Sequence, residues 1–197
     1  MNFTQKIECH YCEETRRLIE EIASLSPKIN SQVYNFALDK ERAQQYKIDK
    51  IPAVVVEAEK DYGIRFFGIP GGYEFNSFIS AIYDVSRKAT DLSVESKDKI
   101  SKIDKPVHIQ VFVTLTCPYC PSAVQMAHKL ALESEYIISD MIESAEFPHL
   151  VSKYGVMGVP KVVINEEFGF EGALPETSFV EEVVKASKSM TEAKDEG

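Results

Sequence analysis

The sequence contains no tryptophan, and its 22 lysines and arginines are outnumbered by 31 aspartates and glutamates. The net charge of -9, without any clustered basic run carrying interleaved aromatics, argues against a nucleic-acid surface. No stretch approaches the roughly 18 apolar residues of a membrane span. The start, Met1–Lys6, lacks the basic and apolar regions of a secretory signal. We therefore expect a soluble, cytoplasmic protein with neither nucleic acid nor membrane as a partner.

No cysteine lies outside two Cys-x-x-Cys pairs, Cys9/Cys12 and Cys117/Cys120. In a cytosolic chain such pairs indicate redox chemistry or metal binding rather than structural disulfides. The 197 residues, of which 44% are hydrophobic, are enough for one large domain or two small ones. The residues around each pair must therefore distinguish between these chemistries and domain numbers.

The second pair stands where a predicted strand meets a predicted helix. Apolar residues alternate with others from Val107 to Thr114, which is typical of a strand with one apolar face. After Pro121 they recur every three or four positions, as in an amphipathic helix. Unpaired N–H groups and the helix dipole lower the pKa of a thiol at such a junction. We expect Cys117 to form the attacking thiolate and Cys120 to resolve the mixed disulfide.

The chain contains this unit twice. The interval from Cys9 to Pro52 equals that from Cys117 to Pro160, and segment 46–56 aligns with 154–164 without a gap. Each copy is predicted to contain a strand, the Cys-x-x-Cys helix, a strand, a short helix, an X-Pro bond, a strand hairpin and a last helix. In the first copy these elements are expected at Phe3–Ile7, Tyr11–Leu25, Val33–Leu38, Lys40–Gln45, Ala53–Ala58, Ile64–Phe67 and Tyr73–Arg87. The polar segment after Lys88 is predicted to hold one further helix.

The order of strand, Cys-x-x-Cys and helix, followed by Lys-Tyr-Gly-Val-x-Gly-Val-Pro at 153–160, resembles the thioredoxin/glutaredoxin superfamily. The Pro-Tyr dipeptide of the second pair resembles that of glutaredoxins. Two such units in one short chain resemble the protein disulfide oxidoreductases of thermophilic archaea and bacteria, over residues 3–188. The resemblance implies an α/β fold of two tandem thioredoxin-like units, each a central mixed β-sheet flanked by helices. We expect the units at 1–88, with a shortened start, and 89–188, and a disordered tail at 189–197.

The resemblance also implies the site residues and partners. Each unit has an attacking cysteine, a resolving cysteine, a cis-proline and, before it, a residue whose backbone pairs with a bound substrate segment. In that order they are Cys9, Cys12, Pro52 and Ile51 in the first unit and Cys117, Cys120, Pro160 and Val159 in the second. The implied reaction is thiol–disulfide exchange on protein thiols and disulfides, with no cofactor beyond the two redox-active disulfides. A thioredoxin-reductase-like protein is the implied electron donor, and the source is expected to be heat-adapted.

The two sites are expected to differ in local charge. Glu13 and Glu14 follow the first pair, whereas Pro121 and Ser122 follow the second, and carboxylates in a first helical turn disfavour a nearby thiolate. We therefore expect Cys117 to be the stronger thiolate. In each pair the first cysteine is expected to be accessible to solvent and the second shielded. No buried acid is expected beneath either pair.

Three other functions compete with protein disulfide exchange. A glutathione-dependent glutaredoxin gains some support from Gly71-Gly72, but the comparable region of the second unit is Pro175-Glu176. The electron-relay module of a peroxide-reducing flavoenzyme also has paired thioredoxin folds, but only one of its units keeps a Cys-x-x-Cys pair. A zinc-binding interaction module would need ligands from two distant helix starts. Oxidation, reduction and isomerisation of protein disulfides all remain compatible with the sequence.

Overall fold

The computed structural model describes residues 1–5 and 9–195, with side chains up to residue 189, and these residues contain eight strands in one mixed sheet. The strands are β1 (Asn2–Thr4), β2 (Val33–Asn35), β3 (Ala53–Glu57), β4 (Asp61–Phe67), β5 (Val107–Val113), β6 (Ile137–Glu143), β7 (Lys161–Ile164) and β8 (Phe168–Glu171). The helices are α1 (Cys12–Ser24), α2 (Lys40–Gln45), α3 (Glu74–Arg87), α4 (Val94–Ile100), α5 (Cys120–Glu133), α6 (Pro148–Lys153) and α7 (Glu176–Asp195).

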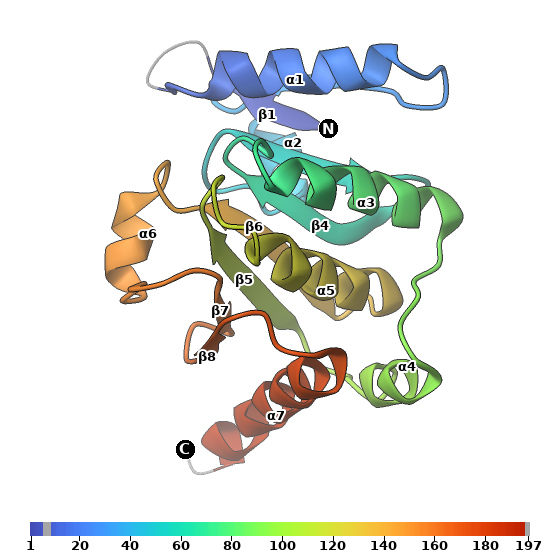
Figure 1. Cartoon of the computed structure of the whole chain (residues 1–197), viewed down its shortest axis with the longest axis vertical. Helices are drawn as coiled ribbons and strands as arrows, with labels where there is room; N and C mark the ends of the chain where they lie inside the picture. The colour runs from blue at the N-terminus through green and yellow to red at the C-terminus, as the bar shows by residue number, and fades with distance from the viewer. Residues whose placement is uncertain (6–8, 196–197) are drawn as a thin grey trace.

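The predicted repeat is visible in the strand order, β2-β1-β3-β4-β6-β5-β7-β8. Each half of the chain supplies four adjacent strands, with its own second strand followed by its first, third and fourth (Figure 1). The halves join through β4 and β6, a parallel pair in register from Ile64↔Ser139 to Phe67↔Ile142. The expected α/β fold of two tandem units is confirmed, and the two units share one continuous sheet.

The apolar residues of each strand alternate between two cores, one on each face of the sheet. In β3, Val54 and Val56 pack in the core beneath α1, α3, α5 and α7, while Val55 packs in the core beneath α2 and α6. The first core also receives Ile100 of α4. Because α3 packs directly on α5, helices of the two units meet on this face as well (Figure 1).

Several elements differ in length from the prediction. The strand β1 ends at Thr4, and residues 6 and 7 of the predicted strand lie outside the described residues. The strand β2 stops at Asn35 because the side chain of Asn35 accepts hydrogen bonds from the N–H groups of Ala37 and Leu38 and closes a turn.

The last helix is longer than predicted. It continues beyond Lys188 to Asp195, so most of the segment 189–197, expected as a disordered tail, is helical. Alanine, lysine, glutamate and methionine in this segment favour helix formation. The helix α3 ends at Arg87, beside the expected boundary at residue 88, and the boundary itself remains a proposal. Within the described residues, no helix is long and apolar enough to cross a membrane.

Candidate active site

The second Cys-x-x-Cys pair closes a disulfide at the start of α5. The Cα atoms of Cys117 and Cys120 are 5.6 Å apart, and Cys120 is the first residue of the helix. The N–H of Cys120 donates to Sγ of Cys117 over 3.2 Å. Pro121 fits the first turn because a proline there gives up no intrahelical hydrogen bond. In the reduced protein this N–H and the dipole of α5 would stabilise a thiolate on Cys117.

The exposure of this pair agrees only in part with the prediction. Cys120 is fully buried, as expected, but Cys117 is only 8% exposed rather than freely accessible. The N–H of Cys117 donates to the carbonyl of Thr114 over 3.1 Å, which folds the turn back over the sheet. The carbonyl oxygen of Val159 lies 3.8 Å from Sγ of Cys117. Little of Cys117 is therefore open to an incoming thiol or disulfide.

Both predicted cis-prolines are confirmed. The peptide bonds Ile51–Pro52 and Val159–Pro160 are cis, and each begins the segment that leads into the third strand of its unit. The carbonyl of Pro52 accepts from the N–H of Gly68 over 2.9 Å, and the second unit repeats this bond between Pro160 and Gly172 at 2.8 Å. The proline itself is thus hydrogen-bonded to the end of its hairpin in the same way in both units.

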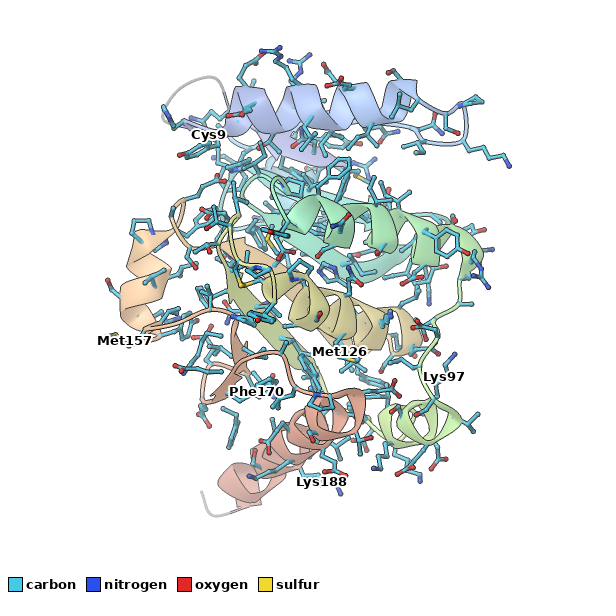
Figure 2. The ribbon with its side chains drawn as sticks, viewed as in Figure 1. Cys9, Lys97, Met126, Met157, Phe170 and Lys188 are labelled. Atoms are coloured by element: carbon cyan, nitrogen blue, oxygen red, sulfur yellow. A yellow bond between two sulfur atoms is a disulfide. The ribbon has the colours of Figure 1, made fainter. Side chains whose placement is uncertain are left out.

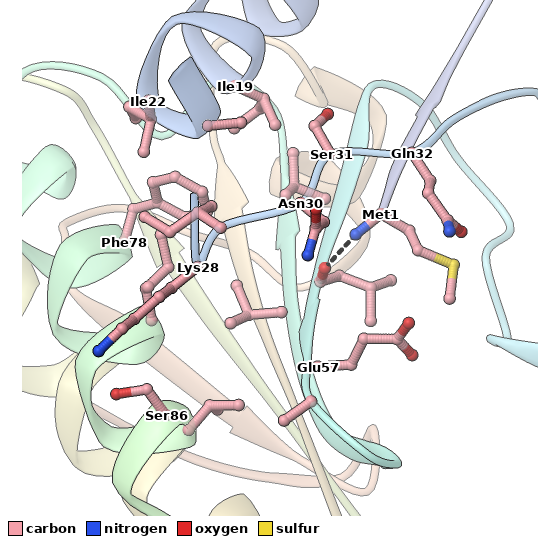
Figure 3. Close-up of a pocket in the computed structure, with 18 residues that line it drawn as sticks. Met1, Ile19, Ile22, Lys28, Asn30, Ser31, Gln32, Glu57, Phe78 and Ser86 are labelled. Atoms are coloured by element: carbon pink, nitrogen blue, oxygen red, sulfur yellow. Dashed lines mark hydrogen bonds between the residues drawn. The ribbon is translucent and has the colours of Figure 1, made fainter. Parts of the chain in front are cut away.

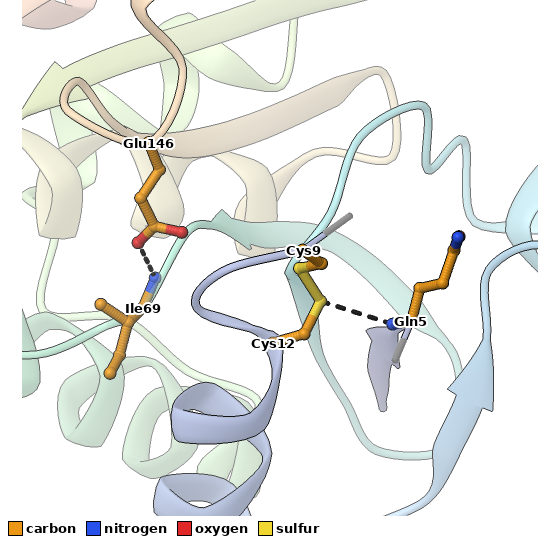
Figure 4. The surroundings of a disulfide bond; sticks show 5 residues. All are labelled: Gln5, Cys9, Cys12, Ile69 and Glu146. Atoms are coloured by element: carbon orange, nitrogen blue, oxygen red, sulfur yellow. Dashed lines mark hydrogen bonds between the residues drawn. A yellow bond between two sulfur atoms is a disulfide. The ribbon is translucent and has the colours of Figure 1, made fainter. Parts of the chain in front are cut away.

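The first Cys-x-x-Cys pair has a different surrounding. Cys9 and Cys12 form a disulfide with Cα atoms 5.4 Å apart, and Cys12 begins α1. Cys12 is buried and Cys9 half-buried, the order that was predicted. Here the N–H of Gln5 donates to the resolving-position sulfur, Sγ of Cys12, over 3.4 Å (Figure 4). Among the described residues, only Cys117 contacts the residue before its cis-proline, Val159.

The charges at the two helix starts follow the prediction. Glu13 and Glu14 occupy the first turn of α1 and are exposed to solvent. The first turn of α5 contains no acid. The predicted order of thiolate strength rests on this difference and remains a prediction.

A buried acid that the sequence did not predict lies near the second site. Glu74, the first residue of α3, is fully buried, and burial raises its pKa to about 7. The N–H of Tyr73 donates to the carbonyl of Leu115 over 3.0 Å, two residues before Cys117. Gly72 has φ +55, and a Cβ there would overlap the carbonyl oxygen of Leu115. The glycine pair considered for glutathione binding thus allows α3 of the first unit to approach the second site.

A second acid, half-buried, crosses the boundary between the units in the opposite direction. Glu146, between β6 and α6, accepts at Oε1 from the N–H of Ile69 over 2.7 Å, and Figure 4 draws both residues with the first disulfide. A Cβ on Gly68 would lie 2.9 Å from that oxygen, so only glycine permits the approach. Burial raises the pKa of Glu146 to about 7, with further contributions from the charges of Glu143 and Glu14. Each unit therefore contributes an acid with a raised pKa at a contact with the other unit.

The acids escaped prediction because each lies far along the chain from the cysteines that it approaches. The available signal was a glutamate two positions after Gly71-Gly72, at the start of a predicted helix. Among the described residues, no group of three or more histidine, cysteine or acidic side chains could hold a metal ion.

A cavity of about 330 Å³, lined by both apolar and polar residues, lies elsewhere in the first unit (Figure 3). Ile19 and Ile22 of α1, Phe78 of α3 and residues of β3 line it. It lies toward the end of α1, whereas the cysteines stand at the beginning of that helix. No cysteine or cis-proline lines this cavity, so it is separate from the disulfide sites.

Two thioredoxin-like units, each with a disulfide at a helix start and a cis-proline, define the class of dithiol–disulfide exchange proteins. The thioredoxin domain family matches residues 107–185. A protein disulfide oxidoreductase from Aeropyrum pernix K1 is 32% identical, with a TM-score of 0.88 over 95% of this chain and 84% of that one. The chain therefore belongs to the family of protein disulfide oxidoreductases with tandem thioredoxin folds.

The similarity extends to a second group of proteins. The alkylhydroperoxide reductase protein AhpF of Enterococcus faecalis is 29% identical, with a TM-score of 0.87 over 92% of this chain and 88% of that one. An alkyl hydroperoxide reductase component of Staphylococcus aureus is 31% identical over 159 residues, 80% of this chain but 29% of the relative. A Bacillus subtilis NADH dehydrogenase is 30% identical over 77% of this chain and 28% of its own length. The chain spans less than a third of the length of these curated relatives. Sequence reasoning gave the peroxide-reducing enzyme little weight, yet the similarity to it covers most of the chain.

Proposed function

We propose that this protein catalyses thiol–disulfide exchange on protein substrates, mainly through Cys117 and Cys120. In the reducing direction the Cys117 thiolate attacks a substrate disulfide, a Cys117–substrate disulfide forms, and the released substrate thiolate takes a proton. Cys120 then loses its proton and attacks Sγ of Cys117, which releases the second substrate thiol. Two electrons and two protons pass to the substrate, and the Cys117–Cys120 disulfide remains. The reverse sequence oxidises a substrate dithiol, and the two directions together allow isomerisation.

The observation that carries this proposal is the position of Sγ of Cys117. It receives the N–H of Cys120 at 3.2 Å, at the positive end of α5, and lies 3.8 Å from the carbonyl oxygen of Val159. The first contact favours a thiolate, and the second places the sulfur beside backbone groups that can pair with an extended substrate segment. The equal interval from Cys9 to Pro52 and the matching bond between Pro52 and Gly68 support Cys9 and Cys12 as a second exchange site.

We further propose that a separate reductase of the thioredoxin-reductase type supplies the electrons, in the cytoplasm of a heat-adapted organism. The names of the longer relatives, an alkyl hydroperoxide reductase component and an NADH dehydrogenase, support a role in passing electrons from such a reductase to disulfide acceptors. The protein would itself need no cofactor besides its cysteines. A melting temperature within the roughly 45–65 °C of mesophilic domains would contradict the assignment to a heat-adapted source.

Insulin reduction with dithiothreitol as the electron source tests the exchange activity. We expect the Cys117→Ser/Cys120→Ser protein to lose most of the activity and Cys9→Ser/Cys12→Ser to lose much less. The variant with all four substitutions should match the rate without protein, and any activity above that rate would contradict the proposal. Turnover with reduced glutathione alone would favour the glutaredoxin alternative. Stoichiometric zinc with no turnover would favour a metal-binding module.

A further inference from the structure

The cavity in the first unit is large enough to hold a small molecule. Its volume of about 330 Å³ lies within the roughly 300–1,000 Å³ of ligand pockets, whereas a close-packed interior contains few voids larger than a water molecule. An apolar wall holds water poorly and attracts apolar molecules instead. The wall of this cavity includes the buried apolar side chains of Ile19, Ile22, Val54, Val56, Phe78 and Val85.

Small residues near the ends of two helices keep this space open. Ala23 lies one residue before the end of α1 and Ser86 one residue before the end of α3, and both line the cavity. Such short side chains fill little of the space between two helices. Oγ of Ser86 also donates to the carbonyl of Tyr83 over 2.7 Å, which holds it against its own helix. The void therefore follows from the sequence of the first unit.

The loop between α1 and β2 adds hydrogen-bond donors to the cavity. Lys28, Asn30 and Ser31 of this loop all line it (Figure 3). Oγ of Ser31 is buried and has no hydrogen-bond partner within the described part of the chain. Lys28 is exposed and forms no ion pair with an acid of the described residues. A carboxylate would accept hydrogen bonds from all three side chains and would give Ser31 the partner that it lacks.

Glu57 also lines the cavity, but its carboxylate does not pair with Lys28. Oε2 of Glu57 accepts from the hydroxyl of Tyr46 over 2.8 Å. Figure 3 shows the carboxylate of Glu57 and the ammonium group of Lys28 pointing in opposite directions. The ammonium group of Lys28 is therefore available to an anionic group of a bound molecule.

We propose that this cavity binds an aliphatic carboxylate, with the hydrocarbon chain between α1, α3 and β3 and the carboxylate at Lys28, Asn30 and Ser31. The apolar wall accounts for the chain, and donors gathered on one loop account for a single head group. The cysteines lie outside this site, since Figure 2 labels Cys9 beside the beginning of α1, whereas the loop follows the end of that helix. The inference assigns a binding activity that is separate from disulfide exchange.

Methyl NMR of the native, oxidised protein, labelled at isoleucine, measures both the affinity and the place of binding. Hexanoate, octanoate and decanoate are titrated in turn. Each buried CH₂ should raise the affinity about fourfold, which is about fifteenfold from one acid to the next, until the cavity is full. The methyl signals of Ile19 and Ile22 should shift, while that of Ile142, in the core on the other face of the sheet, should not.

Variants test the hydrocarbon chain and the head group separately. Ala23→Leu places a larger side chain in the cavity and should weaken decanoate binding about fifteenfold, as if it displaced two methylene groups. Ala89→Leu makes the same change at an exposed position that does not line the cavity and should leave the affinity unchanged. Lys28→Gln should weaken decanoate binding about threefold, the order of an exposed ion pair, and Lys28→Arg should preserve it.

The chain-length series uses the native protein, so it tests the inference even if a variant fails to fold. Equal affinities for the three acids, or the absence of shifts at Ile19 and Ile22, would overturn it. Equal binding of decanoate to the native protein and to folded Ala23→Leu would do the same. If neutral decanamide binds the native protein as tightly as decanoate does, the head group is wrong and the inference fails. Insulin reduction is measured separately, so none of these results decides the exchange activity.

Discussion

Replacing Glu74 with glutamine should change how the stability of this protein depends on pH. The side chain is fully buried, and burial raises its pKa from 4.5 to about 7. A carboxyl whose pKa is higher in the folded than in the unfolded state stabilises the fold only while it is protonated. Its contribution is complete below the unfolded value and disappears as the pH rises through the folded one.

The shift sets the size of the effect. From 4.5 to about 7 it corresponds to about 3 kcal/mol of unfolding free energy, lost by the native protein between those pH values. Glutamine resembles the protonated acid but cannot ionise. We therefore expect Glu74→Gln to match the native protein at about pH 4 and to exceed its unfolding free energy by up to about 3 kcal/mol at about pH 8.

Urea unfolding followed by circular dichroism measures this difference, since the chain has no tryptophan to report by fluorescence. Glu13→Gln provides a matched control, because it makes the same substitution in the first turn of a helix at an exposed position. A difference between Glu74→Gln and the native protein that stays constant from about pH 4 to about pH 8 would refute the assignment of a protonated, buried Glu74.

Three further outcomes are expected. Burial also raises the pKa of Glu146 to about 7, so Glu146→Gln should exceed the unfolding free energy of the native protein only as the pH rises toward about 8. A gain at low pH would contradict this. Gly72 and Gly155 both have positive φ, so Gly155→Ala should lower the unfolding free energy by about 1 kcal/mol. Gly72→Ala should lower it further, because a Cβ on Gly72 would also overlap the carbonyl oxygen of Leu115 in the other unit, and urea unfolding measures both. In the reduced protein, the pH of half-maximal alkylation by iodoacetamide should be lower for Cys117 than for Cys9, as followed by peptide mass spectrometry; the reverse order would show that acids after the first pair do not set thiolate strength.

Most of the fold could be predicted because the chain repeats itself. The equal intervals from Cys9 to Pro52 and from Cys117 to Pro160 placed two helix starts and two cis-prolines, and the structure has all four. The pairing of β4 with β6 could not be read from the sequence, since both strands are largely buried on both faces and a parallel pair of distant segments leaves no local pattern that identifies the partner. The continuous sheet is therefore a property of the assembled units rather than of either one.

The candidate site was predictable where its residues are local in sequence. The cysteines and prolines follow from motif and spacing, whereas the positions of Glu74 and Glu146 depend on contacts between the units. The shielding of Cys117 was missed for the same reason, because Val159, which covers its sulfur, comes from a distant part of the chain. The local sequence identifies the cysteines, and contacts between distant segments determine how exposed Cys117 is.

Trapping a mixed disulfide tests the central claim most directly, namely that Cys117 attacks and Cys120 resolves. Reduced Cys120→Ser protein, in the Cys9→Ser/Cys12→Ser background, is mixed with a disulfide-linked peptide and analysed by intact mass without reductant. The account predicts that a peptide adduct on Cys117 accumulates, because the resolving sulfur is missing. The Cys117→Ser protein in the same background should form no adduct. An adduct on Cys120 in the Cys117→Ser protein, with none on Cys117 in the Cys120→Ser protein, would contradict it.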